Sequence, residues 1–330
     1  MSTNNTFRIK ETEEKIYQII NNGGISILNY ELLKYRNKGS WDARIYDQVS
    51  RLVQYRWGQR VIKWRKWRGY EIVMDAGCGS GLLTKELAKL VPRGKVYAVD
   101  VDSNMIKQAK NNLNSFDNVE IIQSSFTDVR LPRKMDVIFS NSALHWVQDH
   151  RKVFRNFWEM LKPMNDSNDV TDASVIRNNS NNNTAGGDGQ LLIQCGGYGN
   201  LQEIIAILER IIHLDQFKEQ FADWKQPWYF ANAEDTNKLL KEIGYENTAV
   251  YYSDDCVTLP NRRIYSKFVK TVVMKSYLDH LSSHNDIYDI DKLKDLFLEL
   301  FLDEVEKYSS KLNKPWFLDF VRLNVIAHKP

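Results

Sequence analysis

The sequence predicts a doubly wound α/β fold, in which a sheet carries helices on both faces. Short apolar runs alternate with segments whose apolar residues recur at helical spacing. The first run closes on Asp75 and is followed by glycines at alternate positions, Gly77, Gly79 and Gly81, before a helical pattern begins at Leu83. A strand, a tight turn and a helix in this order predict a ligand site at the carboxyl ends of the strands.

The composition is that of a globular protein with room for one large or two ordinary domains. The chain has 330 residues, of which 43% are hydrophobic and 26% charged, and its net charge is +3. So small a charge does not require nucleic acid or an anionic surface as a partner. The three cysteines, Cys78, Cys195 and Cys256, are far apart and odd in number, which favours a reducing compartment and no metal site. No apolar run approaches a membrane span, and we expect a cytoplasmic protein.

Residues 1–40 are predicted to form a helical appendage. They begin polar and offer two short elements separated by Asn21-Asn22-Gly23-Gly24, and they carry no recognisable chemistry. A lid, a packing arm and an oligomer contact all stay open for them.

Aromatic and basic residues alternate in the segment 55–68. Four aromatic residues stand among six basic ones, with no acid in the stretch. Such a segment could stack bases and bind phosphates. The simpler interpretation, which we favour, is an amphipathic helix that buries Trp57, Val61 and Trp64 and exposes its basic face.

The spacing of the glycine turn distinguishes among cofactor-binding motifs. The dinucleotide fingerprint requires a third glycine where Leu82 stands, and a Walker loop requires Gly-Lys followed by Ser or Thr, which is absent. A second strand, 95–100, ends in Asp100, an acid that can accept from both hydroxyls of a ribose. The turn and Asp100 together resemble motif I of class I S-adenosylmethionine (SAM) methyltransferases; the alternative is a purely structural turn.

The remaining elements continue the alternation. Ser103 is expected to cap the helix after the second strand. Further strands are expected at 119–123, 135–140, 190–194, 248–252 and 320–328, and further helices near 201–213, 233–243 and 291–309. Residues 165–189 are rich in Asn, Ser, Asp, Thr and Gly and are predicted to be a disordered surface insertion. Helical elements within 200–230 and 253–318 are expected to form a cap over the ligand edge of the sheet.

Several stretches together resemble class I SAM-dependent methyltransferases of the trans-aconitate methyltransferase type, which are also similar to juvenile hormone acid methyltransferases. They are Trp41-Asp42-Ala43 with Tyr46, the glycine turn, Asp100 with Met105, Ser140 to Val147, Leu161 to Pro163, Gln194 to Gly197, Pro227 to Phe230 and Val321 to Ala327. The likeness covers residues 41–330, which are therefore expected to form the methyltransferase domain. It implies a mostly parallel, Rossmann-like sheet of seven strands whose last strand is antiparallel.

The resemblance also implies a SAM site at the carboxyl edge, with S-adenosylhomocysteine as product and no metal. The residues implied are Asp75 and Gly77 near the methionine end, Gly79 and Gly81 in the turn, Asp100 on the ribose, Val101, Met105, Ser125 and Phe126 near adenine, and Asn141 near the sulfonium. Ser125 stands where the family usually has an Asp that accepts from the adenine amino group. A hydroxyl is a weaker acceptor than a carboxylate.

His145 and Trp146 follow the fourth strand and face the expected position of the methyl group, which makes them the catalytic candidates. His145 would bind the acceptor or take its proton, or else it is a packed residue that orders the loop. The candidates for substrate binding are Tyr46, Gln54, Trp228, Tyr229 and Arg262. Of these, Trp228 and Tyr229 could equally belong to the core, and Arg262 could be a surface charge.

These predictions favour an enzyme that transfers a methyl group from SAM to a small-molecule acceptor, preferably a carboxylate oxygen. A carboxylate is ionised at pH 7 and needs no general base. The rival is a methyltransferase of RNA or protein, or a SAM-binding partner protein, that uses segment 55–68 as its interaction surface. Nucleic acid and membrane are not the expected partners, and the sequence leaves the oligomeric state open.

Overall fold

The computed structural model describes residues 43–164, 189–259, 261–283, 289–312 and 316–330, without the side chains of residues 43–52. The chain divides into two compact units. The sheet unit comprises Trp57–Asn200, Gln226–Asp254 and Val321–Pro330, and the helical unit comprises the described parts of Met1–Arg56, Leu201–Lys225 and Asp255–Phe320. The predicted appendage and all of the predicted insertion except Gly189 lie outside the described residues.

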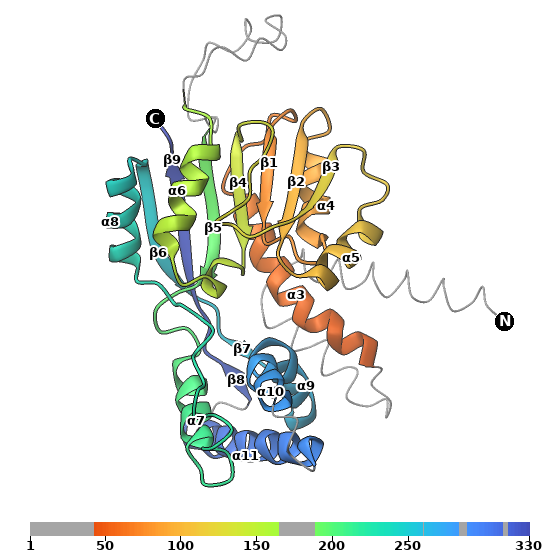
Figure 1. The fold of residues 1–330 in the computed structure, drawn as a ribbon, viewed down its shortest axis with the longest axis vertical. Helices are drawn as coiled ribbons and strands as arrows, with labels where there is room; N and C mark the ends of the chain where they lie inside the picture. Colours follow the sequence, from red (N-terminus) through yellow and green to blue (C-terminus); the bar gives the residue numbers. More distant parts are fainter. Residues whose placement is uncertain (1–42, 165–188, 260, 284–288, 313–315) are drawn as a thin grey trace, which may run out of the picture. The chain divides into compact units, whose positions relative to one another are not determined.

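The sheet unit is built on seven hydrogen-bonded strands (Figure 1). In spatial order they are β3 (Val119–Gln123), β2 (Lys95–Asp100), β1 (Ile72–Ala76), β4 (Val137–Asn141), β5 (Gln190–Gly196), β9 (Val321–His328) and β6 (Glu246–Asp254). Strands β1 to β5 pair in parallel, whereas β9 is antiparallel to both β5 and β6. The predicted fold class is confirmed. The strand order reverses between β1 and β4, and a crevice for a ligand is expected at such a reversal.

Both faces of the sheet are covered by apolar packing. Along β1, Val73 belongs to one buried cluster and its neighbour Met74 to another. The cluster with Met74 includes residues of α6 (His150–Met160) and α8 (Ala233–Ile243), and the cluster with Val73 includes α4 (Leu82–Leu90) and the end of α3 (Ala43–Ile62). Burial on both faces explains why the central strands β1 and β4 are mostly apolar in sequence, whereas the outer strands β3 and β6 also carry exposed polar residues.

The helix after β2, α5 (Ser103–Asn112), begins at the carboxyl edge of the sheet. Its N-cap is Asp102, whose Oδ1 accepts hydrogen bonds from the N–H groups of Asn104 (2.7 Å) and Met105 (2.9 Å). The prediction of Ser103 as the cap is therefore wrong by one residue. The carboxylate of Asp102 already satisfies the free amides of the first turn.

Segment 55–68 is only partly helical. Helix α3 ends before the segment does, and it buries Trp57 and Val61 as predicted, whereas Trp64 lies beyond the end of the helix and is only partly buried. Arg65, however, is buried as well and donates to a carboxylate oxygen of Glu71 (3.1 Å). The predicted solvated basic face is wrong at this position, because an acid just beyond the segment pairs with the guanidinium inside the protein.

The helical unit contains α7 (Gln202–Ile212), α9 (Arg262–Val272), α10 (Lys275–Ser282), α11 (Ile290–Lys311) and the short pair β7 (Val257–Thr258) and β8 (Phe317–Leu318). Its core holds a group of rings in which Phe221 and Tyr277 both stack on Phe297 and are tilted relative to each other. The helices predicted for this part of the chain are confirmed, while their role as a cap stays a prediction. No helix within the described residues is long and apolar enough to cross a membrane.

Candidate functional site

The turn after β1 is held by backbone hydrogen bonds. The N–H groups of Gly77 and Cys78 donate to the carbonyl of Val99 (2.8 and 3.0 Å), which fastens the turn to β2. Gly77, Gly79 and Gly81 have φ angles of 82°, 54° and 85°. A residue with a Cβ rarely adopts such angles, so the backbone itself requires the alternating glycines.

Two of these glycines differ in what surrounds them. A Cβ built on Gly77 would lie 2.3 Å from the Cβ of Ala143, in the loop after β4. A Cβ built on Gly79 would meet no heavy atom of the described residues within 4 Å. Gly77 therefore allows two loops to pack closely, whereas Gly79 borders open space in which a cofactor can lie against the backbone.

Asp100, at the end of β2, is oriented by the turn. Its Oδ2 accepts from the N–H of Gly79 (2.8 Å), and its Oδ1 accepts from the N–H of Asp102 (2.9 Å). Each carboxylate oxygen can accept a second hydrogen bond, so both remain available to the hydroxyls of a ribose. The side chain is partly exposed, which leaves it within reach of a ligand.

Two apolar side chains close to Asp100 in the sequence are exposed. Val101 is 68% exposed and Met105 is 39% exposed. Apolar surface of this kind at a ligand edge is a place that a flat apolar group can cover. It fits the predicted contact with adenine.

Asp75, predicted to lie near the methionine end of the cofactor, is buried at the end of β1. Its Oδ2 accepts from the hydroxyl of Thr84 (2.6 Å). Burial raises the pKa of Asp75 to about 7, with a smaller contribution from Asp100 and against the opposing effect of the Thr84 hydrogen bond. Ionisation of this carboxyl is therefore favoured by a nearby cation.

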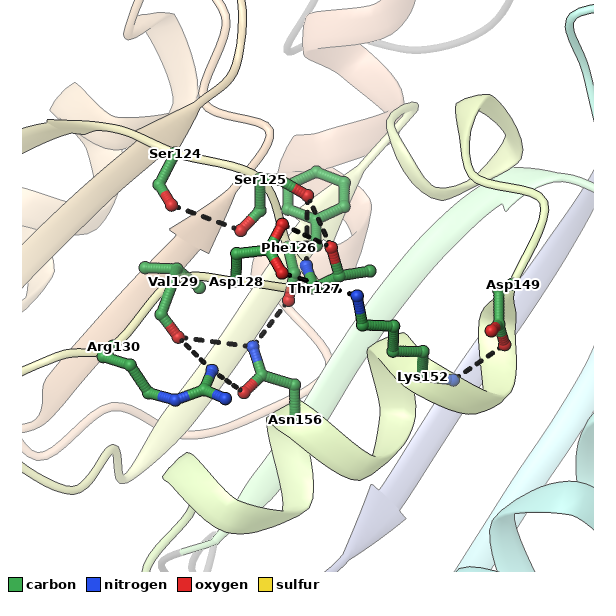
Figure 2. Close-up of polar contacts among 10 residues, drawn as sticks. All are labelled: Ser124, Ser125, Phe126, Thr127, Asp128, Val129, Arg130, Asp149, Lys152 and Asn156. Carbon is green, nitrogen blue, oxygen red and sulfur yellow. Dashed lines mark hydrogen bonds and ion pairs between the residues drawn. The ribbon is translucent and has the colours of Figure 1, made fainter.

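The loop after β3 carries Ser125 and Phe126 and is fixed by α6. Figure 2 shows the side chain of Asn156 pointing from α6 to this loop, where its Nδ2 donates to the carbonyls of Phe126 (2.6 Å) and Val129 (3.3 Å). The hydroxyl of Ser125 is hydrogen bonded to that of Thr127 (2.9 Å). Ser125 is thus engaged within its own loop, and its role toward adenine stays a prediction.

The end of β4 is tied to β5 and β9. Ser142 follows the buried Asn141 with a φ of 58°. Its N–H donates to the carbonyl of Gln194 (2.7 Å), and its hydroxyl accepts from Nη2 of Arg322 (2.8 Å). Arg322 is only 2% exposed, and its guanidinium lies 4.1 Å from the ring centre of Trp57. A buried cation stabilised by an aromatic face therefore lies next to the predicted sulfonium contact.

His145 lies in a short 3-10 helix, Leu144–Trp146, just after this turn. Its Nδ1 accepts a hydrogen bond from the N–H of Gly196 (3.3 Å). The ring is flanked by those of Trp146 and Phe230, whose centres are 5.7 and 6.0 Å away. The position of the imidazole is thus set by the end of β5 and by two aromatic neighbours.

The surroundings of His145 favour its neutral form. Burial lowers the pKa of His145 to about 3, and the charge of Arg322 and the nearby His150 act in the same direction. The imidazole is therefore uncharged throughout the physiological range of pH.

The segment Pro227–Phe230 packs against the same loop. The N–H of Tyr229 donates to the carbonyl of His145 (2.8 Å), and the buried Trp228 meets Trp146 edge-on with 5.7 Å between the ring centres. Trp146 is 49% exposed and Tyr229 is also exposed. The structure therefore brings His145, Trp146, Trp228 and Tyr229 together, with Trp228 as the supporting member.

The other predicted acceptor contacts belong to the helical unit. Tyr46 lies in α3, with its side chain outside the description, and Gln54 is exposed on the same helix. Arg262 forms ion pairs of 2.8 to 3.0 Å with three acids of α11, Glu299, Asp303 and Glu306. These pairs fit a structural role for Arg262, and its role toward an acceptor stays a prediction. In the described part of the chain, no three His, Cys, Asp or Glu residues gather to hold a metal ion.

Comparison with known proteins agrees with this geometry. Residues 73–164 match the family described as a methyltransferase domain. The solved YcgJ protein of Bacillus subtilis shares the fold, with a TM-score of 0.50 and 14% identity over 82% of this chain and 97% of that chain. The chain carries a class I SAM-dependent methyltransferase domain. SAM is its cofactor.

Three relatives of this methyltransferase illustrate how far the likeness extends. An uncharacterized methyltransferase of Schizosaccharomyces pombe, C70.08c, is 26% identical over 88% of this chain and 98% of its own length. The malonyl-[acyl-carrier protein] O-methyltransferase of Priestia megaterium is 29% identical over 42% of this chain, and the trans-aconitate 2-methyltransferase of Deinococcus radiodurans is 33% identical over 29%. The chain spans 50% and 36%, respectively, of the lengths of the latter two.

The residues at the carboxyl edge of the sheet fit SAM. Asp100 offers two acceptor oxygens, Gly79 borders open space, and Val101 and Met105 offer apolar surface. Asp75 offers a carboxyl group whose ionisation a cation would favour. Which atoms of the cofactor each residue contacts stays a prediction.

Some residues that shape the carboxyl edge of the sheet were not among the candidates predicted from the sequence. Arg322, Ser142 and Gly196 shape the surroundings of His145, and Asn156 holds the loop of Phe126. Two of them leave a signal: Arg322 is a charge within an apolar strand, and Asn156 is a polar residue on the apolar face of a helix. Ser142 and Gly196 leave none, since their roles depend on contacts far along the chain.

Proposed function

We propose that this methyltransferase transfers the methyl group of SAM to a carboxylate oxygen of a small acceptor. The observation that carries the proposal is the buried guanidinium of Arg322 beside Ser142 and His145. A fixed positive charge at the ends of β4 and β5 attracts an anionic acceptor and repels an ammonium group. The names of two relatives agree with this class, since one acts on a malonyl group and the other on trans-aconitate.

The proposed roles at the cofactor side follow from chemistry and position. Asp100 holds the ribose, Asp75 faces the cationic amino-acid end, and Asn141 borders the reacting end. When bound, SAM supplies an electrophilic methyl group with a good leaving group. Because the acceptor carboxylate is ionised at pH 7, no residue has to remove a proton.

The proposed contribution of the acceptor side is placement and exclusion of water. Trp146 and Tyr229 present exposed aromatic surface next to His145, supported by the buried Trp228. Holding two reactants in a productive arrangement can contribute about 7 to 11 kcal/mol to the lowering of a barrier. Alignment alone can therefore account for a large rate enhancement.

The proposed domain organisation is a methyltransferase domain over 41–330 with a cap formed by elements of 200–230 and 253–318 and an appendage at 1–40. We also propose a cytoplasmic location. It is supported by the three cysteines, which are all free, with Cys256 exposed.

The test is to incubate the purified protein with methyl-labelled SAM and a panel of carboxylic acids that includes trans-aconitate and a malonyl thioester. Matched panels of amines and alcohols serve as controls, and an extract of the source cells widens the search. We expect label in small molecules that lose it in base, as methyl esters do. Label confined to amines, RNA or protein would contradict the proposal, and label in RNA would direct attention to the exposed basic residues of segment 55–68.

A further inference from the structure

We propose that His145 is held as the tautomer with its proton on Nε2 and positions the acceptor by donating a hydrogen bond to one carboxylate oxygen. It then does not act as a general base. This inference rests on the proposed function for the identity of the acceptor. The tautomer itself is a property of the protein alone.

The first step is the hydrogen bond at Nδ1. The donor is the N–H of Gly196, 3.3 Å away, and a backbone amide cannot exchange its role for that of an acceptor. Gly196 is the last residue of β5 and is paired with Arg322 of β9, so the direction of this N–H is fixed by the sheet. Nδ1 must therefore present its lone pair, and in a neutral imidazole the proton then belongs to Nε2.

The second step is the cost of every other protonation state. A proton on Nδ1 would face the N–H of Gly196, and one donor would lose its partner. The imidazolium would in addition place a charge among charged and titratable neighbours: Arg322 from β9, His150 from α6 and, beside Gly196, the buried Cys195 of β5. Two cations in a partly buried site repel one another.

The third step is the availability of Nε2. Among the described residues no hydrogen bond to Nε2 of His145 is present, and the side chain is only partly buried. Trp146 and Phe230 flank the ring and hold its orientation. A Cβ on Gly196 would lie 2.7 Å from the ring of Phe230, so a glycine is needed for this arrangement. The free N–H is therefore presented by a well-supported ring.

The chemical consequence is that the two oxygens of the acceptor carboxylate have different roles. One oxygen accepts from Nε2–H and is thereby fixed, while the other remains free to attack the methyl group. In the transfer, the attacking oxygen forms the new O–C bond and the C–S bond of the cofactor breaks with its electron pair on sulfur. The negative charge of the acceptor and the positive charge of the sulfonium cancel, and no proton moves.

The first test reads the tautomer directly. Protein labelled with ¹⁵N in its histidines and loaded with S-adenosylhomocysteine is examined by NMR, and the signal of His145 is identified by its absence in His145→Gln. We expect a neutral ring with the proton on Nε2, unchanged between pH 8 and pH 5. A proton on Nδ1, or an imidazolium at pH 6, would overturn the inference whatever the acceptor is.

The second test separates a donor from a base by substitution. The amide of Gln can place an N–H near the position of Nε2 but cannot take a proton, whereas Ala offers neither. With trans-aconitate, or the best acid of the panel, as probe, we expect His145→Gln to stay within about tenfold of the wild type in kcat/KM and His145→Ala to lose about tenfold to a hundredfold. His213→Gln, at the exposed C-cap of α7, is the matched control.

The outcomes distinguish the inference from the proposed function. Equal losses in His145→Gln and His145→Ala, with unchanged affinity for S-adenosylhomocysteine and unchanged thermal unfolding, would refute the donor role. Wild-type turnover in His145→Ala would refute it as well. If instead the ring has its proton on Nε2 but no carboxylic acid is methylated, the proposed function fails and the positioning role fails with it, while the tautomer stands.

Discussion

The proposed cofactor side and the proposed acceptor side of the sheet edge are built from different parts of the chain. On the cofactor side, backbone N–H groups of the glycine turn and the carboxylate of Asp100 form a compact set within residues 75–102. On the acceptor side, side chains meet across long stretches of sequence, such as Ser142 with Arg322 and His145 with Gly196. The first side depends on backbone shape, and the second depends on charge and on the packing of rings.

This difference determines how each side should respond to substitution. A backbone site is lost when a Cβ enters it or when its one anchoring carboxylate is removed. A side-chain site can be retuned by exchanging one group for another of similar shape. Substitutions on one side should therefore leave ligand binding on the other side intact.

The largest effect is expected for Gly77→Ala, which adds strain and a clash at once. The φ of 82° costs about 1–2 kcal/mol for a residue with a Cβ. The contact of 2.3 Å with Ala143 adds about 1–3 kcal/mol. We expect a clear fall in the temperature of thermal unfolding.

Gly79→Ala is the matched control for Gly77→Ala. A Cβ at position 79 is also strained by the positive φ, but it meets no heavy atom within 4 Å among the described residues. The fall in unfolding temperature should therefore be smaller than for Gly77→Ala. It should instead weaken the binding of S-adenosylhomocysteine, measured by calorimetry. Equal destabilisation by the two substitutions would contradict the assignment of open space above Gly79.

The next largest effect is expected for Asp100→Ala. The substitution removes the proposed acceptor of the ribose hydroxyls and leaves the N–H groups of Gly79 and Asp102 without their partner. Affinity for SAM should fall by at least about tenfold. Asp117→Ala, at an exposed position, is the control and should bind normally. Equal affinity of Asp100→Ala and the wild type in calorimetry would refute the ribose assignment.

A smaller effect, confined to the acceptor side, is expected from Arg322. Arg322→Lys keeps the charge, whereas Arg322→Gln keeps a donor for Ser142 without the charge. We expect Arg322→Gln to raise the KM for a carboxylic acid by about tenfold and Arg322→Lys to raise it less, with cofactor affinity unchanged in both. A parallel loss of cofactor affinity would show that the two sides are coupled, and thermal unfolding checks that both variants fold.

The fold could be predicted from the sequence because its signals are local. The strands that carry Asp75 and Asp100 at or near their carboxyl ends are mostly apolar runs, and the helix at 233–243 has the predicted bounds. Errors occur where one residue competes with its neighbour, as at the cap of α5, where Asp102 takes the place predicted for Ser103. The buried Arg65 was missed because its partner Glu71 lies outside the segment whose composition suggested a solvated face.

The residues proposed for the cofactor side could be named for the same reason, since the glycines and the acid at the end of the next strand lie within a short stretch of the sequence. The residues proposed for the acceptor side could be named from the sequence, but their contacts with one another could not be predicted. His145 is a candidate with three open roles, and the proposed choice among them rests on the N–H of Gly196 and the charge of Arg322. Gly196 and Arg322 belong to strands that become adjacent only on folding, so the spacing of residues in the sequence does not predict that they lie near His145.

A further effect is expected from pH, and it also separates the two sides. The pKa of Asp75 is about 7, above its ordinary 3.8. Between these values the folded state binds more protons than the unfolded state, so this group stabilises the fold in acid and the contribution is lost as pH rises through 7.

Binding of a cation beside Asp75 should show the opposite trend. The cationic end of S-adenosylhomocysteine favours the ionised carboxylate, so affinity should rise by up to about tenfold for each pH unit below 7 and level off above it. Asp75→Asn should abolish this dependence. The acceptor side should contribute no such slope, because the pKa of His145, lowered from 6.5 to about 3, keeps its ring neutral from pH 5 upward. A flat affinity profile in the wild-type protein would show that Asp75 does not face the cationic end, and a slope that disappears in His145→Gln would assign the titration to the acceptor side instead.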